Sequence, residues 1–222
     1  MLPTRTPRVK ICCIASLEEA WMAVGHGASA LGLVSAMPSG PGPISEDLIA
    51  EIAARVPPPV ATFLLTSRQD AASIIEQQRR TRVNTIQICD HLATAELQGL
   101  RRSMPGVRLV QVIHVQGPES LEEAKSVASY VDAILLDSGR PKASVKELGG
   151  TGRVHDWSVS RQIRGAVQVP IFLAGGLKAE NVREAIEQVS PFALDLCTGV
   201  RTDGKLDETK LAAFFREVRI AA

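Results

Sequence analysis

The chain has 222 residues, of which 45% are hydrophobic and 22% are charged, and its mean hydropathy is +0.08. This length can build one sizeable core but is short for two full domains, and the composition excludes an intrinsically disordered chain. Lys and Arg total 25 and Asp and Glu total 24, so the formal net charge is +1 and composition favours neither nucleic acid nor a membrane surface as a partner.

One pattern repeats along the chain: a short apolar or β-branched run, a polar break, and a stretch with helical periodicity. The predicted strands are Val9–Ile14, Ala30–Ser35, Val60–Leu65, Thr85–Cys89, Arg108–Val115, Ala133–Ser138, Pro170–Gly175 and Ala193–Thr198. The predicted helices are Leu17–Gly25, Ser45–Arg55, Asp70–Arg79, Thr94–Ser103, Ser120–Ser129, Ser158–Arg164, Ala179–Gln188 and Asp207–Val218. Ser16 and Ser45 precede helices as N-caps, whereas Gly25 and Gly106 lie where helices should end.

Eight strand–helix units of about 28 residues each predict a (β/α)8 TIM barrel that takes up residues 1–222 as a single domain. A doubly wound open sheet is the structural alternative. The closed barrel is favoured because the units follow one another without a long insertion, a linker or a low-complexity tract.

Strand alternation predicts which side chains point into this barrel, because successive residues of a strand face opposite sides. Lys10 and Cys12 share one face of the first strand, and Ile11 and Cys13 share the other. Four side chains are expected to point inward near the carboxyl ends of the strands, where barrel active sites lie: Cys12, Asp137, Asp195 and Cys197.

The four cysteines show no CxxC pair and no His/Cys spacing typical of zinc, so we expect no metal site. We interpret them as reduced thiols of a cytoplasmic protein. The first ten residues lack the apolar core of a signal peptide, and no apolar run reaches the roughly 18 residues of a membrane span. The sequence therefore predicts no membrane partner.

Cys12 and Asp137 could act as a base and an acid at the mouth of the barrel. A cysteine needs a lowered pKa for this work, and Lys10 on the same strand face could supply part of that shift. The alternative is that Cys12 is a small buried hydrophobic residue and that Asp137 caps a turn.

Glycine-bearing loops follow the last three strands, at Gly149–Gly152, Gly175–Gly176 and Thr198–Gly199. Glycine lets exposed backbone N–H groups approach an anion, and barrels often bind phosphate on their last loops. Each glycine pair alone would be an ordinary turn. Together the three loops predict a phosphate site.

Several motifs occur in the order of a known family. They are Lys10-Ile11-Cys12, Leu135-Leu136-Asp137, Gly149-Gly150-Thr151-Gly152, Asp156-Trp157, Leu173-Ala174-Gly175-Gly176-Leu177, Glu180-Asn181-Val182, Asp195 before Thr198-Gly199-Val200, and Asp203-Gly204-Lys205-Leu206-Asp207. Together they resemble the phosphoribosylanthranilate isomerase family, whose members are (β/α)8 enzymes of tryptophan biosynthesis.

This resemblance implies an aldose–ketose isomerase that performs an Amadori rearrangement with no cofactor. Asp137 would be the general acid that protonates the furanose ring oxygen, and Cys12 the general base that removes the C2 proton. Asp195 would contact the anthranilate amino group. The phosphate would lie on Gly150, Thr151, Gly152, Gly175, Gly176, Thr198 and Gly199, and residues 139–156 would close over a small phosphorylated substrate. A monomer and a homodimer are both consistent with the sequence.

The chain also departs from the family pattern. Cys13 stands where the family usually has glycine, and Ala36–Pro43 lacks the arginine that grips the anthranilate carboxylate. Cys89 replaces a histidine, for which His91 could substitute. Arg201 replaces a glutamate and is one candidate partner for the carboxylate.

These departures leave two other functions open. One is a diverged relative that acts on or binds a different sugar phosphate. The other is a non-catalytic phosphate-ligand binder, which would keep the glycine loops but have no use for Cys12. The phosphate loops and the acid/base pair are intact, so the sequence indicates proton transfer on a phosphorylated substrate more firmly than it indicates anthranilate.

Overall fold

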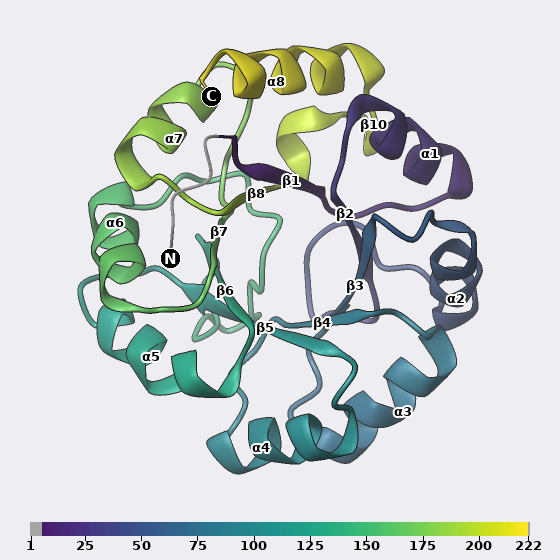
Figure 1. The fold of residues 1–222 in the computed structure, drawn as a ribbon, viewed down its shortest axis with the longest axis vertical. Coiled ribbons are helices and arrows are strands. Elements are labelled where there is room, and N and C mark those ends of the chain that lie inside the picture. The colour runs from purple at the N-terminus through teal and green to yellow at the C-terminus, as the bar shows by residue number, and fades with distance from the viewer. Residues whose placement is uncertain (1–5, 222) are drawn as a thin grey trace.

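A computed structural model, which describes residues 6–221, forms a closed barrel of eight parallel strands inside a ring of eight α-helices (Figure 1). The strands are β1 Arg8–Ile11, β2 Ala30–Val34, β3 Ala61–Thr66, β4 Thr85–Ile88, β5 Arg108–His114, β6 Ala133–Asp137, β7 Ile171–Leu173 and β8 Ala193–Leu196. The helices are α1 Leu17–His26, α2 Glu46–Arg55, α3 Ala71–Thr81, α4 Thr94–Ser103, α5 Ser120–Val127, α6 Trp157–Ala166, α7 Val182–Val189 and α8 Glu208–Ile220.

Pairing between the first and last strands closes the barrel. β1 runs parallel to β8 over four residue pairs, with Lys10 opposite Asp195. An open sheet has two edge strands, each with a single neighbour, whereas every strand of this barrel pairs on both sides. The doubly wound alternative is therefore excluded and the predicted barrel is confirmed.

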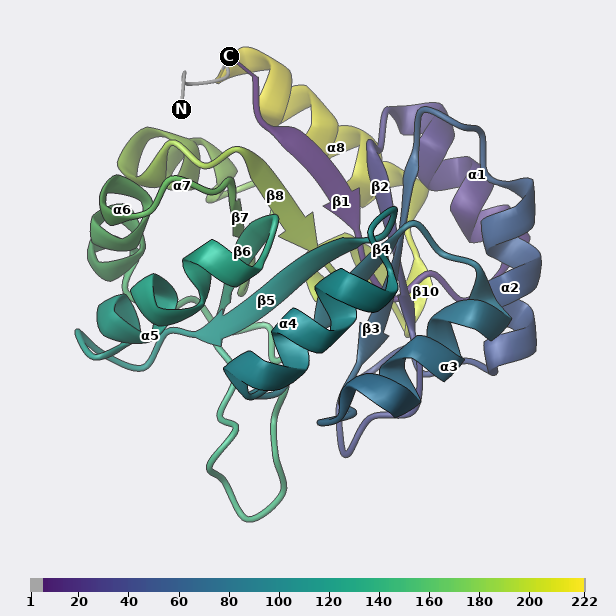
Figure 2. The same ribbon diagram turned by 60° about the horizontal axis from the view of Figure 1, so that its bottom comes forward.

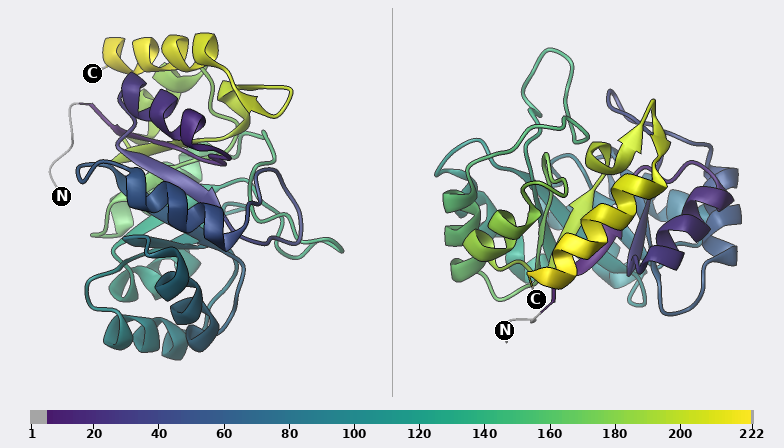
Figure 3. Two further views of the ribbon diagram at one scale, coloured as in Figure 1. Left: turned by 90° about the vertical axis from the view of Figure 1, so that its right-hand side faces the viewer. Right: turned by 90° about the horizontal axis from the view of Figure 1, so that it is seen from above.

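The carboxyl ends of the parallel strands open on one side of the barrel. The long loops after β2 and β6 project from this side, and the β6 loop extends furthest (Figures 2 and 3). The strands therefore bring residues that are distant in the sequence to one rim, as expected for a barrel of this kind.

Strand alternation separates two apolar layers. One side of the strands packs under the helices, with Ile11, Leu31 and Leu194 among its buried residues. The other side fills the interior, where the rings of Phe63 and Phe172 lie 5.8 Å apart between centroids. The inward and outward faces predicted from the alternation are confirmed for the bodies of the strands.

The helix starts follow the predicted capping. Ser16 Oγ accepts the Glu19 N–H and Ser45 Oγ accepts the Leu48 N–H, each at 3.2 Å. The predicted end of the first helix was wrong, because Gly25 lies inside α1, which ends at His26 and is capped by Gly27. Gly27 has φ 107°, a left-handed conformation that favours glycine.

Two local features differ from the prediction. β1 ends at Ile11 instead of Ile14, because Cys13 has φ 62° and breaks the extended backbone. A short hairpin of β9 Arg201–Thr202 and β10 Lys205–Leu206 precedes α8. Its turn residues, Asp203 and Gly204, both have positive φ, as an Asp-Gly hairpin turn requires.

Short 3₁₀ turns at Ala128–Tyr130 and Thr198–Val200 complete the elements. Over residues 6–221, no helix combines the length and the apolar character that a membrane crossing needs.

Candidate active site

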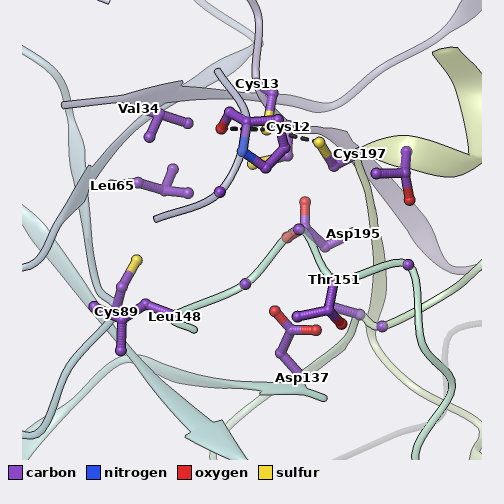
Figure 4. Close-up of a pocket in the computed structure, with 18 of the residues that line it drawn as sticks. Cys12, Cys13, Val34, Leu65, Cys89, Asp137, Leu148, Thr151, Asp195 and Cys197 are labelled. Atoms are coloured by element: carbon purple, nitrogen blue, oxygen red, sulfur yellow. Dashed lines mark hydrogen bonds between the residues drawn. The ribbon is translucent and has the colours of Figure 1, made fainter. Parts of the chain in front are cut away.

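One pocket lies at the carboxyl ends of the strands and is lined from several elements at once. Side chains at the ends of β1, β4, β6 and β8 form its base, and the loops after β2, β6, β7 and β8 form its rim. Figure 4 shows Cys12 and Asp137 on opposite walls of this pocket, with Asp195 between them. The four side chains that were expected to point inward all line it: Cys12, Asp137, Asp195 and Cys197.

Cys12 and Asp137 are both held by the barrel backbone. The Cys12 N–H donates to the Leu196 carbonyl at 2.7 Å, which fixes the end of β1 against β8. Asp137 is the last residue of β6, and its Oδ1 accepts the Ser138 N–H at 2.7 Å. Both side chains are buried, so the pocket can hold a thiol and a carboxyl apart from bulk water.

The pKa of the Cys12 thiol is lowered from its ordinary value. Hydrogen bonding from the thiol of Cys13 is the main cause, and the positive charge of Lys10 adds to it, although burial and the negative charge of Asp195 oppose the shift. The predicted influence of Lys10 is therefore present, but the larger influence comes from Cys13. A thiol with a lowered pKa is the form of cysteine that can act as a base near neutral pH.

Lys10 and Asp195 form a buried ion pair beneath the pocket. Lys10 Nζ donates to Asp195 Oδ1 at 2.8 Å, and its side chain is 0% exposed. Burial alone would lower the pKa of Lys10, but the negative charges of Asp195 and Cys12 raise it above its ordinary value. Burial raises the pKa of Asp195, against the effect of the Lys10 ammonium. A fixed cation therefore lies next to the sulfur of the candidate base.

Gly32 on β2 makes room for this arrangement and was missed by the sequence analysis. A Cβ at Gly32 would lie 2.8 Å from Cys12 Sγ and 3.0 Å from Lys10 Nζ. The signal was available, because a glycine inside a strand often marks a close approach of another group.

The three predicted glycine loops converge on the pocket. Of the residues proposed for phosphate, six line it: Gly150, Thr151, Gly152, Gly175, Gly176 and Thr198. Gly199 does not line the pocket. It packs against the loop after β7, where an added Cβ would lie 1.9 Å from the Leu177 carbonyl oxygen.

The same loops touch one another closely. A Cβ at Gly176 would lie 2.9 Å from the Gly152 carbonyl oxygen, and a Cβ at Gly152 would lie 3.3 Å from Thr198 Oγ1. The loop after β6 also reaches Asp137, since a Cβ at Gly149 would lie 2.9 Å from Asp137 Oδ2. Glycine is needed here because the backbones of separate loops share a small space.

Arg201 does not face the pocket, which corrects its proposed role as a partner for a substrate carboxylate. Its guanidinium forms two bonds of 2.9 Å to the carboxylate of Glu19. It also donates to the Cys12 carbonyl at 3.3 Å and to the Cys13 carbonyl. Arg201 therefore holds the turn after β1 from behind.

The other departures from the family pattern lie at the histidine position and in the β2 loop. Cys89 lines the pocket and is buried, and burial raises the pKa of its thiol. His91 is exposed and does not line the pocket, so it does not replace the missing histidine. Met37, Ser39, Gly40 and Pro41 of the β2 loop line the rim; over residues 6–221 the lining includes no Lys or Arg.

Gln87 on β4 is a second residue that the sequence analysis missed. It lines the pocket, its Oε1 is buried without a hydrogen-bond partner, and its Nε2 lies 3.8 Å from Cys89 Sγ. A polar side chain at the inward end of a predicted strand was the available signal, because such a group needs a partner.

Comparisons with known proteins agree with the barrel and its pocket. The family model described as N-(5'phosphoribosyl)anthranilate (PRA) isomerase matches residues 9–217. The N-(5'-phosphoribosyl)anthranilate isomerase of Methanosarcina acetivorans is 36% identical, over 96% of this chain and 93% of the relative. That of Methanocella arvoryzae is 34% identical, over 96% of this chain and 98% of the relative.

Solved structures give the same result. Phosphoribosyl anthranilate isomerase from Thermotoga maritima superposes with a TM-score of 0.82 at 29% identity, covering 96% of this chain and 98% of that one. A phosphoribosyl anthranilate isomerase in complex with reduced 1-(o-carboxyphenylamino)-1-deoxyribulose 5-phosphate has a TM-score of 0.79 at 27% identity, with the same coverage. Sequence and fold agree over nearly the whole length, so this chain belongs to the N-(5'-phosphoribosyl)anthranilate isomerase family.

Proposed function

We propose that this chain converts N-(5'-phosphoribosyl)anthranilate into 1-(o-carboxyphenylamino)-1-deoxyribulose 5-phosphate, an Amadori rearrangement of tryptophan biosynthesis. The observation that carries the proposal is the placement of Cys12 and Asp137 on opposite walls of one pocket, in a chain of this family. The reaction moves protons within one substrate, and a base and an acid on opposite sides of that substrate suffice for it.

Asp137 is the general acid in this proposal. Its carboxyl donates a proton to the furanose ring oxygen, the bond from C1 to that oxygen breaks, and the ring opens to an iminium at C1. The Ser138 N–H, at 2.7 Å from Oδ1, then stabilises the carboxylate that remains.

Cys12 is the general base. Its thiolate takes the proton from C2, the electrons of that bond neutralise the iminium, and an enolamine forms. Tautomerisation of the enolamine moves a proton to C1 and leaves the ketone at C2, so the product has the same atoms as the substrate. Lys10 supports the thiolate, because its positive charge favours the deprotonated sulfur.

The glycine loops are proposed to hold the phosphate. Within residues 6–221, the backbone N–H groups of Gly175 and Gly176 donate no hydrogen bond to the chain itself, which leaves them available for an anion. Asp195 would accept a hydrogen bond from the amino N–H of the aglycone, and the loop after β6 would exclude water from the pocket. The family member solved with a phosphorylated product analogue supports a small phosphorylated ligand.

The direct test is turnover of phosphoribosylanthranilate by the wild type and by Cys12→Ala and Asp137→Asn. Loss of either proton-transfer group should lower kcat by roughly 10²- to 10⁴-fold. Asp132→Asn is the matched control, because Asp132 immediately precedes β6 at the opposite end of the barrel and pairs there with Arg101 and Arg108. Full activity in both active-site variants would refute the assigned roles, and failure of the folded wild type to turn over this substrate or to rescue an isomerase-deficient tryptophan auxotroph would refute the activity.

The absence of a cation from the described lining favours one second candidate, a relative that acts on a sugar phosphate whose nitrogen substituent bears no carboxylate. A carboxylate in a cleft normally gains a charge-assisted partner. A comparison of kcat/KM for phosphoribosylanthranilate and for phosphoribosylaniline separates the two. A preference of tenfold or more for the anthranilate supports the main proposal, and equal or reversed values support the second.

A further inference from the structure

Two thiols meet at the rim of the pocket, apart from the proposed acid and base. Cys197 Sγ lies 2.7 Å from Cys13 Sγ, although the two residues are 184 positions apart in the chain. Figure 4 shows Cys197, just after β8, pointing across to Cys13 in the turn after β1. The separation exceeds a covalent S–S bond of about 2.05 Å by less than one ångström.

The backbone holds Cys13 in this position. Its φ of 62° turns the side chain toward the pocket, and Arg201 fixes its carbonyl from behind. The β2 loop covers it on another side, since a Cβ at Gly42 would lie 2.6 Å from Cys13 Cβ. The Pro41 carbonyl oxygen lies 3.6 Å from Cys13 Sγ. The sulfur therefore has little freedom to leave Cys197.

We propose that Cys13 and Cys197 form a reversible disulfide when the protein meets a hydroperoxide, and that this pair is an oxidation site distinct from Cys12. The geometry selects this pair over the vicinal one. Cα atoms of adjacent residues are about 3.8 Å apart, whereas disulfides normally need about 4.4–6.8 Å. Cys12 and Cys13 are adjacent and fall outside that range.

The disulfide forms in two steps: peroxide oxidises one thiol, and the second thiol then attacks the oxidised sulfur. The exposure of the two cysteines indicates which thiol is oxidised first. Cys197 is partly exposed, whereas Cys13 is buried and its pKa is raised, chiefly by hydrogen bonding with Cys12 and Cys197. Hydrogen peroxide therefore meets Cys197 first. Cys197 loses its thiol proton, and the resulting thiolate attacks one oxygen of the peroxide. The O–O bond breaks, which gives a sulfenic acid and hydroxide. The proton released from the thiol then converts the hydroxide into one water.

The sulfur of Cys13 then attacks the sulfenic sulfur of Cys197. The S–O bond breaks, hydroxide leaves with the proton of the Cys13 thiol as a second water, and the S–S bond forms. Two thiols lose two electrons in total, and one hydrogen peroxide is reduced to two waters. A dithiol such as dithiothreitol reverses the change by thiol–disulfide exchange.

The test is treatment of the reduced full-length protein with one equivalent of hydrogen peroxide, followed by alkylation of the remaining thiols. We expect the number of alkylated cysteines to fall from the four of the reduced chain by two. Because the cross-link spans 184 positions, the oxidised chain should migrate faster on a denaturing non-reducing gel, and dithiothreitol should restore the original mobility. A vicinal Cys12–Cys13 bond would not change mobility.

Single serine variants identify which two cysteines form the bond. Two of them test the same bond, so the experiment still works if one variant does not fold. The fast band should be lost in Cys13→Ser and in Cys197→Ser, and retained in Cys12→Ser and Cys89→Ser. Circular dichroism confirms that each variant is folded, and either Cys13→Ser or Cys197→Ser alone suffices. Retention of the band in these two variants, its loss in Cys12→Ser, or alkylation of both Cys13 and Cys197 after oxidation would overturn the proposal. None of these readouts requires isomerase activity, so the result is independent of the proposed function.

Discussion

The turn after β1 shows how one unusual backbone conformation can set the chemistry of a neighbour. Cys13 has φ 62°, in the left-handed region that costs a non-glycine residue roughly 1–2 kcal/mol. That conformation brings its thiol to the pocket, where it is the largest influence lowering the pKa of Cys12. A glycine would adopt the same backbone without strain, but it would provide no donor for the neighbouring sulfur.

Cys13→Ala should therefore weaken the base. Loss of the donor raises the pKa of Cys12 relative to the wild type, and a base acts only when deprotonated. The low-pH limb of kcat/KM should move to higher pH, so that activity falls several-fold near neutral pH and recovers in alkaline buffer. Cys13→Ser is the matched control, because its hydroxyl keeps a donor at the same position. Identical pH profiles for wild type and Cys13→Ala would contradict this account.

At the scale of elements, β2 leaves room for the active site at Gly32, where the strand has no side chain. The inward position at Gly32 is occupied by Cys12 Sγ and Lys10 Nζ from the neighbouring strand. An added methyl group would also lie 3.1 Å from the Cys12 Cα, and this backbone atom cannot move freely. The position of the Cys12 sulfur thus depends on the absence of a side chain at Gly32.

Gly32→Ala should displace the base and lower kcat/KM by roughly 10- to 100-fold. Gly25→Ala is the control, because a Cβ at Gly25 meets nothing within 4 Å and the residue lies in α1. That change should leave activity intact and stabilise the protein by about 0.5–1 kcal/mol. Steady-state kinetics and urea unfolding of both variants provide the measurements. Wild-type kinetics in Gly32→Ala would contradict this prediction, because they would mean that β2 can shift and accept the methyl group without displacing Cys12.

How much of the site can be predicted from the sequence depends on how far apart in the chain the interacting residues lie. Period-two alternation is local, so it correctly placed Cys12, Asp137 and Asp195 on the pocket side of their strands. It failed at Cys13, where the alternation ends in a left-handed turn. It also gave no direction for Arg201, because the partner of that side chain, Glu19, is 182 positions away.

At the scale of the whole molecule, polar contacts join the first and last units of the chain. Lys10 pairs with Asp195 inside the barrel, where β1 meets β8. Outside the pocket, Arg201 pairs with Glu19 of α1 and binds the carbonyls of Cys12 and Cys13. The first and last units of the chain therefore place Cys12 together, through the ion pair that joins β1 to β8 and through the bonds from Arg201 to the turn after β1.

Arg201→Ala should destabilise the protein by about 3 kcal/mol, because it leaves the nearly buried Glu19 carboxylate and two carbonyl groups without their partner. Arg55→Ala is the control, since its pair with Glu51 is exposed and should contribute less than about 0.5 kcal/mol. Urea unfolding at neutral pH measures both differences, and an equal loss in the two variants would contradict the structural role of Arg201.

The pH dependence of this difference gives a second test of the same pair. Burial would raise the pKa of Glu19, but its hydrogen bonds with Arg201 and with the backbone N–H groups of Leu206 and Ala15 hold it below its ordinary value of 4.5. A carboxyl with a lowered folded-state pKa contributes stability above its unfolded value and loses that contribution as the pH falls through the folded value. The gap in unfolding free energy between wild type and Arg201→Ala should therefore be full near neutral pH and shrink below pH 4.5. A constant gap across that range would mean that Arg201 stabilises the turn through the carbonyls of Cys12 and Cys13 alone.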